Sequence, residues 1–143
     1  IFFQDKEHFL NPEKKVFDKD RIIEFLNDKG IALYDTASAI RRLQDNASDK
    51  FLEVIEQTDI SLLLKQIPMC KAIVTTGQKA TDIIREQIEV KEPTVGTSEP
   101  FEFGDKAMKL YRMPSSSRAY PLALEKKAVA YRVMFNELGL LNE

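Results

Sequence analysis

A run of small hydroxyl-bearing residues is the part of this sequence best suited to chemistry. Met113-Pro114-Ser115-Ser116-Ser117-Arg118, hereafter the serine loop, stands between an alternating segment and a long amphipathic one. Proline removes a ladder hydrogen-bond donor and serine side chains compete for backbone hydrogen bonds, so a strand cannot continue here. Serine hydroxyls and adjacent backbone N–H groups can bind the oxygen atoms of a phosphate group. The alternative interpretation is a strand-to-helix turn that caps the last helix.

Two more candidates follow short apolar runs. Asp35 comes after the run 31–34, and Thr76-Gly77 come after the run 72–75. A carboxylate can accept a hydrogen bond from a ligand N–H group or orient a water molecule. Glycine lets the backbone approach a ligand closely. The alternative for Asp35 is a side chain that caps the following turn.

These candidates need particular elements to position them. Apolar residues at helical spacing predict helices, and short apolar or alternating runs bounded by turn residues predict strands. The predicted helices cover residues 18–29, 60–66, 78–90 and 122–138, and the predicted strands cover 31–34, 72–75 and 106–112. Residues 36–56 are predicted to form a loop with one or two short helices, and Gly104-Asp105 a hairpin turn.

Strands that alternate with helices predict an α/β fold, here a three-layer α/β/α sandwich around a central, mainly parallel sheet. In open parallel sheets, ligands bind at the carboxyl ends of the strands. Asp35, Thr76-Gly77 and the serine loop follow the three predicted strands. We therefore expect them to line one site in a single domain over residues 1–143.

The composition limits the function classes. The chain has 143 residues, of which 43% are hydrophobic, and this is enough for one core. No stretch approaches the roughly eighteen apolar residues that a membrane helix needs, so we expect a soluble protein. Because a single cysteine points to a reducing compartment, we expect the protein in the cytoplasm. The single cysteine, Cys70, cannot form an internal disulfide or a metal cluster, and we expect it in the core. We expect no cofactor and no metal, and the net charge of -2 disfavours non-specific coating of nucleic acid.

In order and spacing, three segments resemble the uracil-DNA glycosylase superfamily, in particular the branch related to mismatch-specific and hypoxanthine-DNA glycosylases. In that branch the loop sequence is Leu-Pro-Ser-Thr-Ser-Pro-Ala, to which the serine loop is similar. The other matching segments are Gly30-Ile31-Ala32-Leu33-Tyr34-Asp35, Ala72-Ile73-Val74-Thr75-Thr76-Gly77 with Lys79-Ala80, and the helix that carries Lys126, Lys127, Tyr131, Arg132 and Phe135. The resemblance covers nearly all of the chain from about Asp18 onward.

This resemblance implies a DNA glycosylase of base excision repair that flips a deaminated base, uracil or hypoxanthine, out of DNA. Water then cleaves the N-glycosidic bond. Separately, we expect the protein to be a monomer. The resemblance implies that Asp35, Thr76, Gly77 and Met113 line the base pocket, with Asp35 as the candidate catalytic residue. It implies that Ser115, Ser116 and Ser117 contact DNA, and that Arg118 fills the vacated stack or binds a phosphate.

The sequence departs from the superfamily at several points. Its Gly-rich first motif, which carries or adjoins the catalytic acid or amide, has no counterpart here, so we expect an N-terminally incomplete domain. Met113 stands where the classical uracil enzymes have a histidine, and branch relatives tend to have asparagine in place of Thr76. His8, the only histidine, lies in a polar segment and is predicted to be a surface residue. An alternative is therefore a catalytically inactive member that binds DNA or a partner protein. A Rossmann-like small-ligand binder is a third hypothesis, although no Gly-x-Gly-x-x-Gly or P-loop motif occurs.

Overall fold

The computed structural model describes residues 1–42 and 52–141. The chain divides into two compact units, Ile1–Tyr34 with Phe135–Glu143, and Asp35–Met134. We call them unit 1 and unit 2. The expectation of a single domain over residues 1–143 stays a prediction. No helix within the described residues is both long enough and apolar enough to cross a membrane.

Unit 1 is built from one helix and a minimal hairpin. Strands β1 (Leu10–Asn11) and β2 (Val16–Phe17) pair antiparallel, and α1 (Lys19–Lys29) follows them. Asp18 caps α1, because its carboxylate accepts the backbone N–H of Arg21 at 3.2 Å. Gly30 ends the helix in the left-handed conformation, with φ of 70°. The helix predicted over 18–29 is confirmed, with its first predicted residue serving as the cap.

Aromatic side chains pack together in unit 1. The ring of Phe25, on α1, lies 5.0 Å from that of Phe2 and 5.3 Å from that of Phe9, centroid to centroid. Phe2 also lies 4.9 Å from Phe135. These are the separations at which edge-to-face and tilted ring pairs are favourable. The cluster joins the N-terminal segment to α1 and to the end of the last helix.

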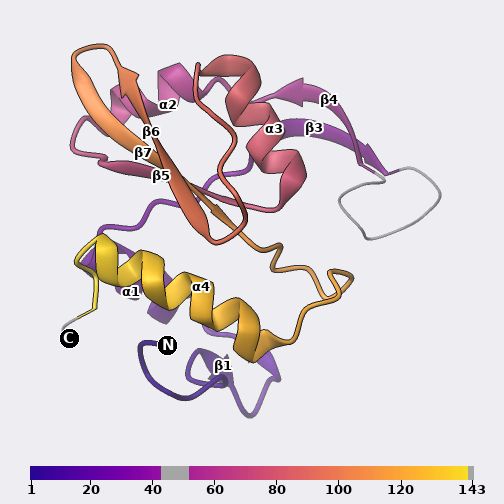
Figure 1. The fold of residues 1–143 in the computed structure, drawn as a ribbon. Coiled ribbons are helices and arrows are strands. Elements are labelled where there is room, and N and C mark those ends of the chain that lie inside the picture. The colour runs from indigo at the N-terminus through magenta and orange to yellow at the C-terminus, as the bar shows by residue number, and fades with distance from the viewer. Residues whose placement is uncertain (43–51, 142–143) are drawn as a thin grey trace. The chain divides into compact units, whose positions relative to one another are not determined.

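A three-stranded mixed sheet forms the centre of unit 2 (Figure 1). Its order is β5 (Ala72–Thr76), β7 (Lys106–Met113), β6 (Thr97–Phe103). Strand β5 runs parallel to β7, while β6 and β7 form an antiparallel hairpin through Gly104-Asp105. The two predicted strands in this region, the hairpin and the parallel pairing are confirmed. The sheet is mixed, and the predicted three-layer arrangement is taken up below as a proposal.

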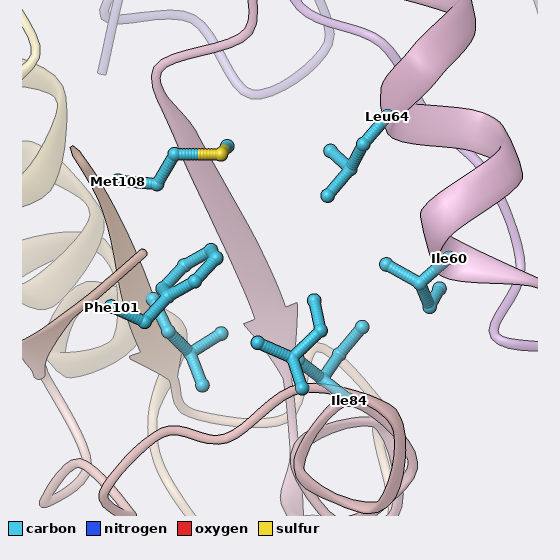
Figure 2. Close-up of a cluster of buried hydrophobic side chains, with 7 residues drawn as sticks. Ile60, Leu64, Ile84, Phe101 and Met108 are labelled. Carbon is cyan, nitrogen blue, oxygen red and sulfur yellow. The ribbon is translucent and has the colours of Figure 1, made fainter. Parts of the chain in front are cut away.

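Two helices pack against one face of this sheet. They are α2 (Ile60–Gln66), capped by the Asp59 carboxylate, and α3 (Gln78–Gln87). Figure 2 shows Ile60 and Leu64 of α2 pointing toward Ile84, Phe101 and Met108. The full cluster consists of Ile60, Leu64, Ile84, Ile88, Phe101, Met108 and Leu110. Each such side chain contributes about 1.5–3 kcal/mol when it is fully buried, so this cluster is the main source of stability in unit 2.

The other helices also match their predictions closely. Helix α2 has the predicted bounds, and α4 covers Leu124–Glu137 instead of 122–138. Helix α3 ends at Gln87 because Ile88 is already extended, with φ of −129° and ψ of 132°. Residues 88–90 therefore lie outside the helix, although Ile88 still packs into the core.

Two predictions about the region before α2 are wrong. Residues 31–34 form no strand, and the side chains of Leu33 and Tyr34 are 71% and 73% exposed. Instead of a loop with short helices, the region 36–56 contains β3 (Ala37–Arg42) and most of β4 (Leu52–Gln57), which pair antiparallel as a separate sheet. The part of the predicted loop over 43–51 lies outside the described residues. A four-residue apolar run does not by itself specify a strand, since the strand also needs a neighbour for its backbone hydrogen bonds.

Candidate nucleic-acid interface

The carboxyl ends of β5 and β7 bring three predicted site residues together. Thr76 and Met113 are directly paired across the two parallel strands. The backbone N–H of Gly77 then donates to the Met113 carbonyl oxygen at 3.1 Å. Gly77 has φ of 106° and ψ of 171°, a conformation that is essentially restricted to glycine. At this edge the Thr76 side chain is exposed and Met113 is completely buried.

The serine loop is held by its own hydroxyl groups. The Ser115 hydroxyl oxygen accepts the backbone N–H of Ser117 at 3.2 Å, and the Ser117 hydroxyl oxygen accepts that of Ala119 at 3.2 Å. Ser115 is only 7% exposed. Ser116 and Arg118 alternate with these two residues and are exposed. The loop therefore uses two of its serines to define its conformation and presents Ser116 and Arg118 to solvent.

Helix α4 fastens the same loop through two side chains. The Lys127 ammonium donates to the Ser117 carbonyl oxygen at 2.9 Å and lies 5.5 Å from the centre of the Tyr120 ring. The Tyr131 hydroxyl lies 3.5 Å from the Pro114 carbonyl oxygen, at the outer limit of a hydrogen bond. Burial raises the pKa of Tyr131, so the phenol keeps the proton that it can donate.

Lys127 and Tyr131 are functional candidates that the site prediction did not include. Their spacing of four residues places them on the same face of α4. Both residues belong to the helix that follows the serine loop in the resemblance to glycosylases. Their i, i+4 spacing and their nearness in sequence to the serine loop could therefore have indicated a contact with the loop. The sequence did not show that Lys127 has a partner, and a buried lysine is not expected without one.

Asp35 lies apart from the other predicted pocket residues. Its carbonyl oxygen accepts the Thr58 hydroxyl at 2.6 Å, and the Thr58 carbonyl oxygen accepts the Gln87 side-chain amide at 2.8 Å. Gln87 is the last residue of α3, whereas Thr76-Gly77 precede the first. The ten-residue helix α3 is about 15 Å long. Asp35 is thus located at the opposite end of α3 from the serine loop, with its side chain exposed.

A charged cluster lies beside the Gly77 turn. The Arg112 guanidinium contacts the Gln78 side-chain oxygen, and it lies 3.4 Å from a Glu92 carboxylate oxygen and 3.1 Å from the Pro93 carbonyl. A hydrogen bond from Gln78 holds the pKa of Glu92 below its ordinary value, with help from the charges of Arg112 and Arg85 against a burial effect in the opposite direction. Since Arg112 is paired in this way, it serves to fasten the segment after α3.

The remaining chemically notable residues lie elsewhere. Cys70 is half-buried and packs against the core of unit 2, as expected. His8 belongs to unit 1, where its ring stacks on Phe3 at 3.6 Å and its Nε2 lies 3.1 Å from an Arg21 nitrogen. Because a guanidinium only donates, Nε2 must act as the acceptor. Within residues 1–42 and 52–141, no three His, Cys, Asp or Glu side chains are grouped so that they could hold a metal ion.

Comparison with known proteins does not assign the chain to a family. No family model, no curated protein and no solved structure matches it. Functional interpretation therefore depends on the residues at the edge of the sheet in unit 2.

Proposed function

We propose that this chain is a uracil-DNA glycosylase-type domain that acts as a DNA glycosylase in base excision repair. It would bind DNA around an extruded deaminated base, uracil or hypoxanthine, and hydrolyse the N-glycosidic bond. The observation that supports this proposal is the position of the serine loop. It follows the carboxyl end of a parallel strand and adjoins the Gly77 turn, and Ser116 and Arg118 are exposed on it.

The internal hydrogen bonds of the loop suit a phosphate contact. A loop whose conformation is already defined loses little conformational entropy when it binds a ligand. The exposed Ser116 hydroxyl can approach a phosphate oxygen closely because its side chain is short. The exposed Arg118 guanidinium can bind a second phosphate, or it can occupy the space that the extruded base leaves.

We propose that the base pocket lies at the edge of the sheet where β5 and β7 end, and that Thr76, Gly77 and Met113 form it. Thr76 offers an exposed hydroxyl, which can both donate to and accept from a base edge. Met113 is completely buried, so it can support this pocket only from the interior. It offers no strong donor and cannot stabilise the negative charge that develops on a leaving base. Asp35 lies at the opposite end of α3 from this edge, so it could orient water for the reaction only if it moved close to the serine loop.

The complete fold that we propose is the three-layer sandwich. Successive residues of a strand point to opposite faces of a sheet, and Leu110 and Tyr111 on β7 are both buried. Both faces of β7 are therefore covered near its carboxyl end. A Cβ atom added at Gly96, next to the start of β6, would lie 3.7 Å from that of Ala130 on α4. These features support α4 as the layer opposite α2 and α3.

A second candidate function is a non-catalytic member of the same superfamily that binds DNA or a partner protein. The position of Asp35 favours it, because the candidate catalytic carboxylate lies at the far end of α3 from the serine loop. In that case the loop would bind DNA or a partner protein, and no base would be removed.

An excision assay separates the two functions. The purified chain is incubated with single-stranded and duplex oligonucleotides that carry one uracil or one hypoxanthine, and abasic sites are revealed by alkaline cleavage. We expect cleavage at the modified position only, with an undamaged oligonucleotide of the same sequence as the control. Binding to an abasic duplex without excision would favour the non-catalytic function. A chain that neither cleaves nor binds these oligonucleotides would contradict the glycosylase function and leave a partner protein as the ligand of the second function.

A further inference from the structure

We propose that Lys127 is a positioning residue for the serine loop: it fixes the Ser117 carbonyl from the interior and thereby sets the directions of Ser116 and Arg118. This inference rests on the proposed function, because it assigns Lys127 a part in DNA binding without a contact to DNA. The observations that support it are the burial of Lys127 and the partners of its ammonium group.

Lys127 is an unusual buried residue. It is 7% exposed, although lysine side chains are almost never fully buried unless they are paired. A buried ammonium is costly without hydrogen bonds. Its partners are the Ser117 carbonyl oxygen at 2.9 Å and the face of the Tyr120 ring at 5.5 Å. Within the described part of the chain, no carboxylate forms an ion pair with it. The loop itself therefore compensates the charge.

Ser117 is the residue through which this charge acts. Its N–H donates to the Ser115 hydroxyl, its own hydroxyl accepts from Ala119, and its carbonyl oxygen accepts from both Lys127 and the Tyr120 backbone N–H, the latter at 3.1 Å. The N–H, the hydroxyl oxygen and the carbonyl oxygen of Ser117 are thus all engaged. The two exposed residues of the loop, Ser116 and Arg118, are its immediate neighbours in sequence, so their positions depend on how Ser117 is held.

A direct contact between Lys127 and a phosphate is the competing explanation. It would require the ammonium to leave the Ser117 carbonyl and reach solvent from a buried position. The two roles differ in a measurable property. A lysine that binds a phosphate releases a counterion, and its loss reduces the slope of log affinity against log salt concentration by about 1. A positioning residue changes the affinity without that change in slope.

The test compares Lys127→Met, which removes the donor, with Lys127→Arg, which keeps one. The exposed neighbour Lys126 provides the matched control, Lys126→Met. In the free chain, amide hydrogen exchange of Ala119 and Tyr120 reports the loop, and that of β5 and β7 reports the sheet. Binding to an abasic duplex is then measured at several salt concentrations.

In the free chain, we expect Lys127→Met to speed exchange at Ala119 and Tyr120 on the order of tenfold, while β5 and β7 keep their rates. We expect its affinity for abasic DNA to fall by a similar factor with an unchanged salt slope. Lys127→Arg should retain most of the slow loop exchange and most of the affinity of the original chain. Lys126→Met should leave loop exchange as it is in the original chain.

Three results would overturn the proposal. They are unchanged exchange in the loop, equal acceleration in the loop and the sheet, and a salt slope reduced by about one. If Lys127→Met does not fold, Lys127→Ala takes its place under the same criteria, since alanine also lacks a side-chain donor and is a good helix former. If the original chain binds no DNA, the proposed function fails. Exchange in the loop then still decides whether Lys127 holds it.

Discussion

At the scale of single residues, the serines of the loop divide into two groups. Ser115 and Ser117 accept backbone N–H groups of the loop itself, whereas Ser116 is exposed. The prediction from sequence gave all three serines the same role. Local hydrogen bonds of this kind depend on backbone angles, which the residue type does not determine. This division predicts different consequences for otherwise identical Ser→Ala substitutions.

We predict that Ser116→Ala combined with Arg118→Ala weakens binding to an abasic duplex on the order of tenfold or more. The reason is that one hydroxyl contact and one charge-assisted contact to phosphate are lost. Fluorescence anisotropy with a labelled duplex measures the effect. Lys109→Ala is the control, since Lys109 is an exposed cation on β7 away from the loop. If the double variant bound the duplex with unchanged affinity, the serine loop would not be part of the proposed DNA interface.

Glu92 predicts a pH dependence of stability. Its pKa is lowered in the folded chain, so the folded state prefers the ionised carboxylate. The contribution of the Glu92 carboxylate to the free energy of unfolding is therefore fully present above its ordinary pKa of about 4.5. It is lost as the pH falls through the lowered pKa of the folded chain. We expect Glu92→Gln to be less stable than the original chain at pH 7 and to approach it below pH 4.5 in urea titrations at each pH. The exposed Glu89→Gln serves as the control, and a pH-independent difference for Glu92→Gln would contradict the prediction.

At the scale of elements, the unit β5–Gly77–α3 connects the sheet to the site. Gly77 redirects the chain from strand to helix within one residue, and its N–H binds the Met113 carbonyl at the start of the serine loop. A buried pair of hydroxyls supports the turn, with the Thr81 hydroxyl 2.8 Å from both the Gly77 carbonyl oxygen and the Thr75 hydroxyl. The geometry of the site thus depends on a backbone conformation that only glycine adopts easily.

We predict that Gly77→Ala lowers the free energy of unfolding by about 1–3 kcal/mol, because φ of 106° with ψ of 171° is strained for any residue with a Cβ atom. The same substitution should weaken binding to abasic DNA, since it displaces the start of the serine loop. Gly104→Ala is the comparison: its φ of 60° is a left-handed value that other residues tolerate better, and no atom would lie within 4 Å of the added carbon. Chemical denaturation measures both variants, and equal losses would argue against a special role for the Gly77 conformation.

Most elements were predictable because their signals are local. Asp18 and Asp59 each accept a backbone N–H group at the start of a helix, and such caps are visible in the sequence. The site residues Thr76 and Met113 were placed together correctly because adjacent parallel strands end at the same edge. Asp35 was not, because that prediction required residues 31–34 to join the same sheet. Whether a short apolar run finds a partner strand depends on the rest of the fold, and periodicity does not contain that information.

The pairing of β3 with β4 was missed for a related reason. In β4, Leu52, Val54 and Ile55 include two β-branched residues, which favour a strand. The polar sequence that follows Thr36 nevertheless favoured a loop. The buried Lys127 was missed because charged residues are normally assigned to a solvent face, and its partner is a backbone carbonyl ten residues earlier. Contacts of this kind become visible only when the loop has a defined conformation.

At the scale of the whole molecule, the two units differ in how they are stabilised. Unit 2 contains a cluster of seven buried apolar residues from two helices and two strands, with Ile88 just after α3. In unit 1, α1 has no buried residue, and Phe25 forms ring pairs with the partly exposed Phe2 and Phe9. Stability rises with the apolar area that is buried, so unit 1 should open more readily than unit 2.

We predict that backbone amides of α1 exchange with solvent faster than those of β5 and β7. Leu110 is completely buried, so Leu110→Ala should cost about 2–5 kcal/mol and speed exchange throughout the sheet of unit 2. Phe25→Ala should speed exchange in α1 while leaving the sheet unchanged, because its ring contacts lie in unit 1. The exposed Val129→Ala is the control. If Leu110→Ala accelerated α1 as much as the sheet, the two units would unfold as one cooperative body, and the division at Tyr34 and Phe135 would have no counterpart in stability.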